Sequence, residues 1–195
     1  MNYDLPGRRS DSTDPRALRT RNALVQAVLR LLNDHEVADL NVSQIVKEAG
    51  VSRQVFYQHF ADRDALILAA AADWVLAAYE RFAERFEIDQ NFEASVVELA
   101  SVAAGKGVAA GRLIDSPVHP VLDNEVQRVM QDTMRKQLLP RAKEWGDADA
   151  ELVADMSRVY VAGMQRLIEQ CVREGCTAEE IGRRAEAVRR VLIRE

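Results

Sequence analysis

Arg53 and Gln54 follow closely after Gly50 and carry side chains suited to reading the edges of DNA bases. An arginine guanidinium can donate two hydrogen bonds to guanine, and a glutamine amide can pair with adenine in the major groove. Ser52 precedes them and adds a hydroxyl, and Lys47 supplies a positive charge that suits a phosphate. These residue types indicate recognition of DNA by hydrogen bonding.

Residues that could support catalysis are sparse. The chain has three histidines, His35, His59 and His119, and no Ser/His/Asp or Cys/His set is suggested by their positions. The run 105–107, Gly-Lys-Gly, lacks the spacing of a phosphate-binding loop and a preceding strand. We therefore interpret it as a helix break, and we expect neither enzymatic activity nor a cofactor.

The two cysteines, Cys171 and Cys176, are five residues apart, on or just after a predicted helix. An i, i+5 spacing on a helix points the side chains apart. We therefore expect two reduced cysteines with a structural role, since thiols stay reduced in the cytosol; a redox switch is the alternative. We expect no metal site, because the segment offers too few ligands.

The composition is that of an ordinary soluble globular protein. Of the 195 residues, 48% are hydrophobic and 29% are charged, and the net charge is −5. Residues 1–66 carry nine basic and nine acidic side chains, so the excess negative charge lies further along the chain. No apolar run reaches the roughly 18–20 residues of a membrane span, and the polar start does not resemble a signal peptide. We expect a cytoplasmic protein that does not contact a membrane.

Hydrophobic periodicity predicts three helices in the N-terminal third. Asp14-Pro15 starts the first, which fades near residue 33. Asn41 caps the second, with Gln44 placed for a capping box, and Gly50 ends it. Ser52 starts the third, and Asp62 caps a long helix that follows. Two short helices joined through a glycine predict a helix-turn-helix, whose second helix enters the major groove, about 12 Å wide.

Helices are also predicted over the rest of the chain. The ranges are 92–104, a shorter piece to 114, 121–145, 150–174 and 177–194. No segment alternates as a β-strand does. We therefore predict an all-α fold with three parts: a flexible arm over 1–13, a helix-turn-helix DNA-binding domain over 14–62, and a helical effector-binding and dimerisation domain over 63–195.

The sequence of residues 41–60 resembles the DNA-binding signature of the TetR family of transcriptional regulators. The strongest pieces are Ala-Gly-Val-Ser at 49–52 and Tyr-x-His-Phe at 57–60, and residues 62–66 resemble the continuation. The resemblance covers roughly residues 16–66. Val46 replaces the usual alanine and Arg63 the usual lysine. Beyond this region, the chain matches the family only in being helical and of suitable length.

The resemblance, together with the positions of the donor side chains, predicts a set of DNA-binding residues. Tyr57 and His59 occupy positions that the family uses for phosphate contacts. Arg63 lies at the first turn of the next helix, where free backbone N–H groups also favour a phosphate. The full set is Asn41, Ser43, Lys47, Ser52, Arg53, Gln54, Tyr57, His59 and Arg63.

The resemblance implies that the C-terminal helices dimerise and bind an effector. Broad apolar stripes on the last two helices suit a four-helix bundle between two chains, although packing within one chain is the alternative. The expected dimer interface contains Met156, Tyr160, Gly163, Leu167, Ile181, Ala185, Val188 and Leu192. The expected effector pocket contains Trp74, Tyr79, Arg112, His119, Met130, Met134 and Tyr160.

The leading hypothesis is a homodimeric repressor that binds double-stranded operator DNA at a palindromic site. A small, mainly apolar effector would release it by shifting the helix after Asp62. The alternative is an architectural DNA-binding protein or an activator with the same fold and no small ligand. An absent or collapsed cavity would favour this alternative.

Overall fold

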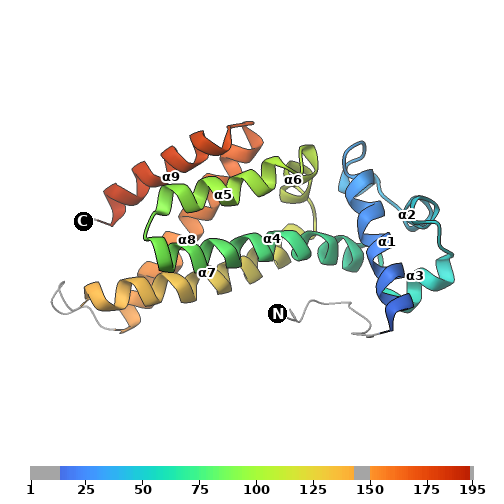
Figure 1. The fold of residues 1–195 in the computed structure, drawn as a ribbon, viewed down its shortest axis with the longest axis horizontal. Coiled ribbons are helices and arrows are strands. Elements are labelled where there is room, and N and C mark those ends of the chain that lie inside the picture. Colours follow the sequence, from blue (N-terminus) through green and yellow to red (C-terminus); the bar gives the residue numbers. More distant parts are fainter. Residues whose placement is uncertain (1–13, 143–149, 194–195) are drawn as a thin grey trace. The chain divides into compact units, whose positions relative to one another are not determined.

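The computed structural model describes residues 14–142 and 150–193, and these form helices with short connections and no β-strand (Figure 1). The all-α prediction is therefore confirmed; the predicted arm over 1–13 lies outside the described residues. None of the described helices has the length and apolar character to cross a membrane. The α-helices are α1 (Pro15–Leu31), α2 (Val42–Ala49), α3 (Arg53–His59), α4 (Arg63–Asp89), α5 (Phe92–Ala104), α6 (Val108–Ile114), α7 (His119–Ala142), α8 (Ala150–Arg173) and α9 (Ala178–Leu192).

The described residues divide into two compact units. The first unit combines the chain up to Trp74 with the later segment Gly107–Leu122. The second unit combines Val75–Lys106 with the chain from Asp123 onward. The division between these units falls inside α4, the helix that follows Asp62. Leu66 and Ile67, on the first turns of α4, are fully buried within the first unit.

Local hydrogen bonds set the ends of the helices in the first unit. The Asp14 side chain accepts from the backbone N–H of Arg16 at the start of α1. At the start of α2, the Asn41 side chain accepts from the Gln44 N–H, while the Gln44 side chain accepts from the Asn41 N–H. These caps satisfy backbone donors that have no partner within the helix.

The second unit contains the rest of α4 together with α5, most of α7, α8 and α9. Helices α5 and α9 lie side by side along their length (Figure 1). Gly182 permits this approach, because a Cβ atom there would lie 2.5 Å from Val97 Cγ2 and 3.2 Å from the Glu93 carbonyl oxygen. The core between the helices buries residues from α4, α5, α8 and α9, among them Phe82, Phe92 and Cys171.

Candidate DNA-binding surface and effector cavity

The turn between α2 and α3 depends on Gly50. Its φ of +69° lies in the left-handed region, which glycine adopts without steric cost. The Gly50 N–H donates to the Lys47 carbonyl at 3.3 Å, and the Val51 N–H donates to the Val46 carbonyl at 3.0 Å. The Ser52 hydroxyl then accepts from the Val55 N–H at 3.2 Å and starts α3. The turn therefore follows from local sequence, as expected.

The predicted base-reading side chains lie at the exposed start of α3. Arg53, Gln54 and Tyr57 are all exposed to solvent. The Arg53 guanidinium donates to the Ser43 hydroxyl of α2. This bond tethers the guanidinium beside α2 and leaves most of its donors for another partner, because an arginine has five N–H groups.

The remaining predicted contacts on α2 and α3 divide into exposed and engaged groups. Ser43 and Lys47 are exposed on α2, and His59 is half-buried at the end of α3. Asn41 and Ser52 are exposed, but their side-chain oxygens already cap the two helices. The side-chain oxygens of these two residues are therefore used within the domain.

Arg63 has a structural role in addition to its predicted phosphate contact. Its guanidinium donates to the backbone carbonyls of Leu40 at 2.8 Å and Ala38 at 3.3 Å, and it pairs with Asp64 at 2.8 Å. Only 26% of its side chain is exposed. In this structure, therefore, Arg63 fastens α4 to the segment that leads into α2.

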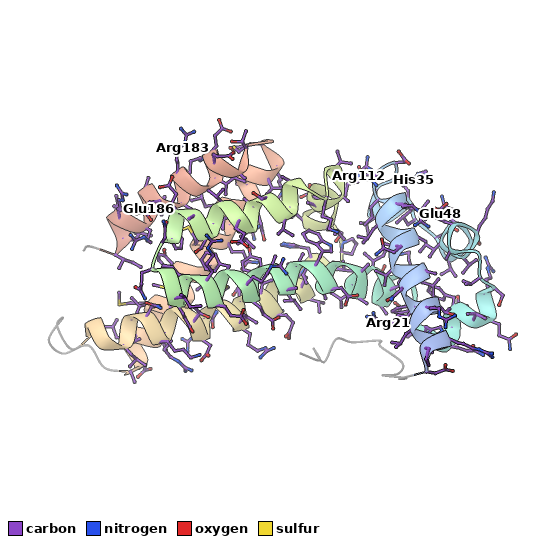
Figure 2. The ribbon with its side chains drawn as sticks, in the orientation of Figure 1. Arg21, His35, Glu48, Arg112, Arg183 and Glu186 are labelled. Carbon is purple, nitrogen blue, oxygen red and sulfur yellow. The ribbon has the colours of Figure 1, made fainter. Side chains whose placement is uncertain are left out.

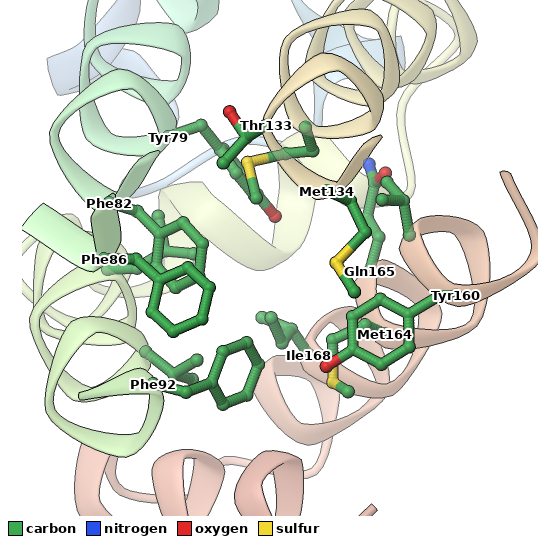
Figure 3. Close-up of a pocket in the computed structure, with 14 residues that line it drawn as sticks. Tyr79, Phe82, Phe86, Phe92, Thr133, Met134, Tyr160, Met164, Gln165 and Ile168 are labelled. Carbon is green, nitrogen blue, oxygen red and sulfur yellow. The ribbon is translucent and has the colours of Figure 1, made fainter. Parts of the chain in front are cut away.

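The second unit contains a cavity lined mainly by aromatic and methionine side chains (Figure 3). Figure 3 shows Phe82, Phe86 and Phe92 on one side and Met134, Met164 and Tyr160 on the other. The cavity itself measures about 40 Å³, and the empty space among its lining atoms, opening included, is about 530 Å³. Its wall is almost wholly apolar.

Two buried polar atoms in the cavity wall have no hydrogen-bond partner, the Tyr160 hydroxyl and Gln165 Oε1. The Gln165 amide nitrogen donates to Asp123, which leaves Oε1 as a hydrogen-bond acceptor. Burial raises the pKa of Tyr160 above its ordinary value, as it does for Tyr79, so both phenols remain protonated donors at neutral pH. Among the described residues that line the cavity, one donor and one acceptor thus lie buried without a hydrogen-bond partner behind an almost wholly apolar surface.

The structure brings four of the seven expected effector residues to this cavity: Tyr79, Met130, Met134 and Tyr160. Trp74, Arg112 and His119 are not among its lining residues. The sequence reading also missed lining residues such as Phe82, Phe86 and Gln165. The two phenylalanines have the i, i+4 spacing of an ordinary core stripe, which cannot be distinguished from a cavity wall in sequence.

Arg112, expected in the effector pocket, contacts the end of α1 instead (Figure 2). Its guanidinium donates to the Leu32 carbonyl at 2.7 Å and pairs with Glu36 at 2.8 Å. A positive charge near the last carbonyls of a helix is favourable, because these oxygens carry partial negative charge. Arg112 therefore joins α6 to α1 within the first unit.

The residues expected at the dimer interface separate into two groups. Ile181 and Ala185 are buried in the core of their own chain, and Met156, Tyr160 and Leu167 pack against core clusters. For these five, the packing seen is within the chain. Gly163, Val188 and Leu192 are exposed, as are Leu152, Val159 and Val191, which lie outside the expected set.

The two cysteines lie close together, contrary to the expectation from helical spacing. Helix α8 ends at Arg173, and Gly175 with φ of +72° reverses the chain. The Cys176 N–H then donates to the Cys171 carbonyl at 3.0 Å. The helical rule fails because Cys176 lies beyond the helix end, in a turn that folds back on α8.

The comparisons with known proteins agree with this architecture. Residues 24–70 match the family model described as bacterial regulatory proteins, tetR family. The matched region covers the second half of α1, all of α2 and α3, and the first turns of α4. Among curated proteins, no match to this sequence is found.

Solved structures share the fold over most of the chain. A TetR transcriptional regulator from Streptococcus agalactiae has a TM-score of 0.59 and 16% identity, and covers 90% of this chain and 96% of its own. SmeT, the repressor of the Stenotrophomonas maltophilia multidrug efflux pump SmeDEF, has a TM-score of 0.58 and 18% identity, and the match covers 89% of this chain and 91% of SmeT. The fatty acid degradation regulator FadR from Bacillus halodurans has a TM-score of 0.60 and 16% identity, and the match covers 95% of this chain and 100% of FadR. The helix-turn-helix region of this chain thus matches the tetR family of bacterial regulatory proteins, and its described residues share their fold with solved TetR regulators.

Proposed function

We propose that this DNA-binding regulator acts as a homodimeric repressor, with α3 of each chain reading one half of a palindromic operator. The observation that carries the proposal is the exposed start of α3, where Arg53 and Gln54 are open to solvent and the Arg53 guanidinium donates to the Ser43 hydroxyl. Two recognition helices spaced by one helical turn of DNA, about 34 Å, would bind two half-sites together. Regulators of this family bind DNA and are not enzymes, and we propose the same for this protein.

The exposed apolar side chains of α8 and α9 support dimerisation through these helices. Val159 and Val191 are each 75% exposed, and Leu192 is 61% exposed. Several large apolar side chains exposed on two helices that pack together are typical of a surface covered by a partner. The proposed interface therefore comprises Leu152, Val159, Gly163, Val188, Val191 and Leu192.

We further propose that the effector is a small, mainly apolar molecule that binds in the cavity of the second unit. The aromatic wall suits an apolar body, while the Tyr160 hydroxyl and Gln165 Oε1 suit polar groups that accept and donate a hydrogen bond. A cavity of about 40 Å³ must enlarge to admit such a ligand. Met130, Met134 and Met164 can supply that adjustment, since methionine side chains repack readily.

Release would follow if the effector favours a form that does not bind the operator. Helix α4 is continuous from Arg63 to Asp89 and supplies Tyr79, Phe82 and Phe86 to the cavity wall. The effector can lower operator affinity only by as much as it prefers the non-binding form. SmeT, a structural neighbour, is described as a repressor and in a complex with triclosan, which supports ligand control of this fold.

The test is selection of bound DNA from a genomic library with the full-length protein and with Arg53→Ala, at a stated salt concentration. We expect a palindromic site, and we expect the variant to bind it about 1–3 kcal/mol more weakly, the value of one bidentate base contact. Equal binding to all sequences by both proteins would overturn the operator proposal.

The small cavity favours one alternative, a DNA-binding architectural protein or activator without a small ligand. Screening apolar hydroxylated compounds for release of the selected operator distinguishes the two. Release by a compound that no longer acts on Gln165→Leu would support the effector site. Operator binding that no cavity-binding compound changes would favour the alternative.

A further inference from the structure

Cys171 and Cys176 form a close pair at the turn between α8 and α9. Their sulfur atoms and a carboxylate oxygen of Glu174 all lie within 4.8 Å of one another. Cys171 is fully buried in the core of the second unit, whereas Cys176 is partly exposed. The pair therefore combines one thiol that solvent can reach with a second thiol directly behind it.

The backbone holds the two residues together. In addition to the Cys176 N–H bond to the Cys171 carbonyl, the Gly175 N–H donates to the Val172 carbonyl at 3.1 Å. This pair of bonds around a left-handed glycine is the Schellman motif, which brings the side chain after the glycine onto the last turn of the helix. The approach is thus fixed by the fold.

Arg184 of α9 places a positive charge beside the partly exposed thiol of Cys176. Its guanidinium donates to Cys176 Sγ at 3.5 Å and to Glu174 Oε2 at 2.8 Å. The guanidinium is thus placed to donate to the sulfur while it attacks as the thiolate, which is the reactive form of cysteine, and it also pairs with the Glu174 carboxylate that lies 3.9 Å from Cys176 Sγ. The same cation opposes a metal ion, because it occupies the carboxylate and the sulfur that a metal would need.

We propose that Cys171 and Cys176 are an oxidation site that closes reversibly into an intrachain disulfide on reaction with a hydroperoxide. The Cys176 thiolate attacks one peroxide oxygen, the O–O bond breaks, hydroxide leaves and Cys176 becomes a sulfenic acid. The hydroxide released from the peroxide takes the proton of the Cys171 thiol and becomes the first water. The Cys171 thiolate then attacks the Cys176 sulfur, the S–S bond forms, and the S–O bond of the sulfenic acid breaks to release a second hydroxide. This second hydroxide combines with the proton that Cys176 lost when it became a thiolate and gives the second water. In sum, two thiols and one hydrogen peroxide give one disulfide and two waters.

The roles of the two thiols are unequal. Burial raises the pKa of Cys171, an effect that the nearby Arg184 partly offsets. Cys171 therefore stays a thiol until Cys176 has been oxidised, and it then acts as the resolving cysteine. A small rotation of side chains must close the sulfur separation to the disulfide length of about 2.05 Å.

The test treats the reduced full-length protein with hydrogen peroxide and follows intact mass, free thiols and mobility on non-reducing gels. We expect both thiols to disappear together, the mass to fall by two hydrogens, the chain to remain uncrosslinked, and dithiothreitol to reverse the change. Addition of oxygen atoms without loss of hydrogens, or crosslinking between chains, would overturn the proposal. So would one tightly held zinc ion per chain that shields both thiols, which would indicate a metal site.

Three variants assign the roles. Cys171→Ser should stop at a sulfenic acid on Cys176 that dimedone traps, and Cys176→Ser should leave Cys171 many-fold slower to react. Arg184→Gln should slow oxidation several-fold, while Arg183→Gln, a matched change at an exposed neighbouring arginine of α9, should not (Figure 2). Circular dichroism melting confirms that each variant is folded. Equal slowing by the two arginine variants would remove the role assigned to Arg184.

Discussion

Arg53 and Arg63, two arginines of the first unit, have different roles. Arg53 is exposed and makes one side-chain contact with Ser43, whereas Arg63 is mostly covered and bonded to backbone carbonyls. A side chain that stabilises the domain and one that contacts DNA respond differently to mutation. Stability and operator affinity should therefore separate the two arginines.

Arg63→Ala should destabilise the protein by about 1–2 kcal/mol, because the Leu40 and Ala38 carbonyls lose a charged donor. Urea unfolding measures this change. Arg53→Ala, the matched variant, should leave the free energy of unfolding within about 0.5 kcal/mol of the parent value, as surface changes usually do. Unchanged unfolding in Arg63→Ala would contradict the structural role.

Glu186 should make stability depend on pH. It is buried and accepts from Arg189 Nε and Arg190 Nε, each at 2.7 Å, and these bonds hold its pKa below the ordinary glutamate value. Because the folded pKa is lowered, the stabilisation is present above the unfolded pKa of about 4.3 and is lost as the pH falls below it.

Glu186→Gln should therefore have a free energy of unfolding at pH 7 that is lower than the parent value by about 1.5–3 kcal/mol, the value of hydrogen bonds to a charged group, as urea unfolding would measure. The difference should shrink as the pH is lowered toward 3. A difference that stays constant over this range would show that the carboxylate charge contributes nothing.

At the scale of elements, the close approach of α5 and α9 should be the contact least tolerant of added volume. Gly182→Ala places a Cβ atom against Val97 and the Glu93 carbonyl, and overpacking costs about 1–3 kcal/mol. Gly111→Ala in α6 is the matched control, because nothing lies within 4 Å of its Cβ position. Both variants gain the same helix propensity, so the difference between their unfolding free energies isolates the packing cost. Equal unfolding free energies for the two variants would mean that α5 and α9 move apart to accommodate the added methyl group at no cost.

At the scale of the whole molecule, dimerisation is the proposal with the clearest single test. Val159→Glu puts a charge on the exposed apolar face of α8 and should convert the dimer to monomers in sedimentation equilibrium, with loss of operator binding. Ile88→Glu is the control, since Ile88 is 79% exposed on α4, outside the proposed interface. A Val159→Glu protein that remains dimeric would place the interface elsewhere.

The sequence by itself determined the local structure of this protein. The caps at Asn41 and Ser52 and the left-handed turn at Gly50 were all predicted, because each depends on residues a few positions away. The resemblance over residues 41–60 likewise predicted the family, which the match over 24–70 supports. These features need no knowledge of what packs on them.

Only the tertiary structure decided what covers each apolar stripe. Periodicity marked Ile181 and Ala185 as one face of a helix, but their partner is the core of the same chain. In the same way, the pairing of Cys171 with Cys176 and the contacts of Arg63 and Arg112 depend on how segments approach one another. Helical periodicity gives the direction of a side chain relative to its own axis, whereas its neighbours are set by packing between segments that are distant in sequence.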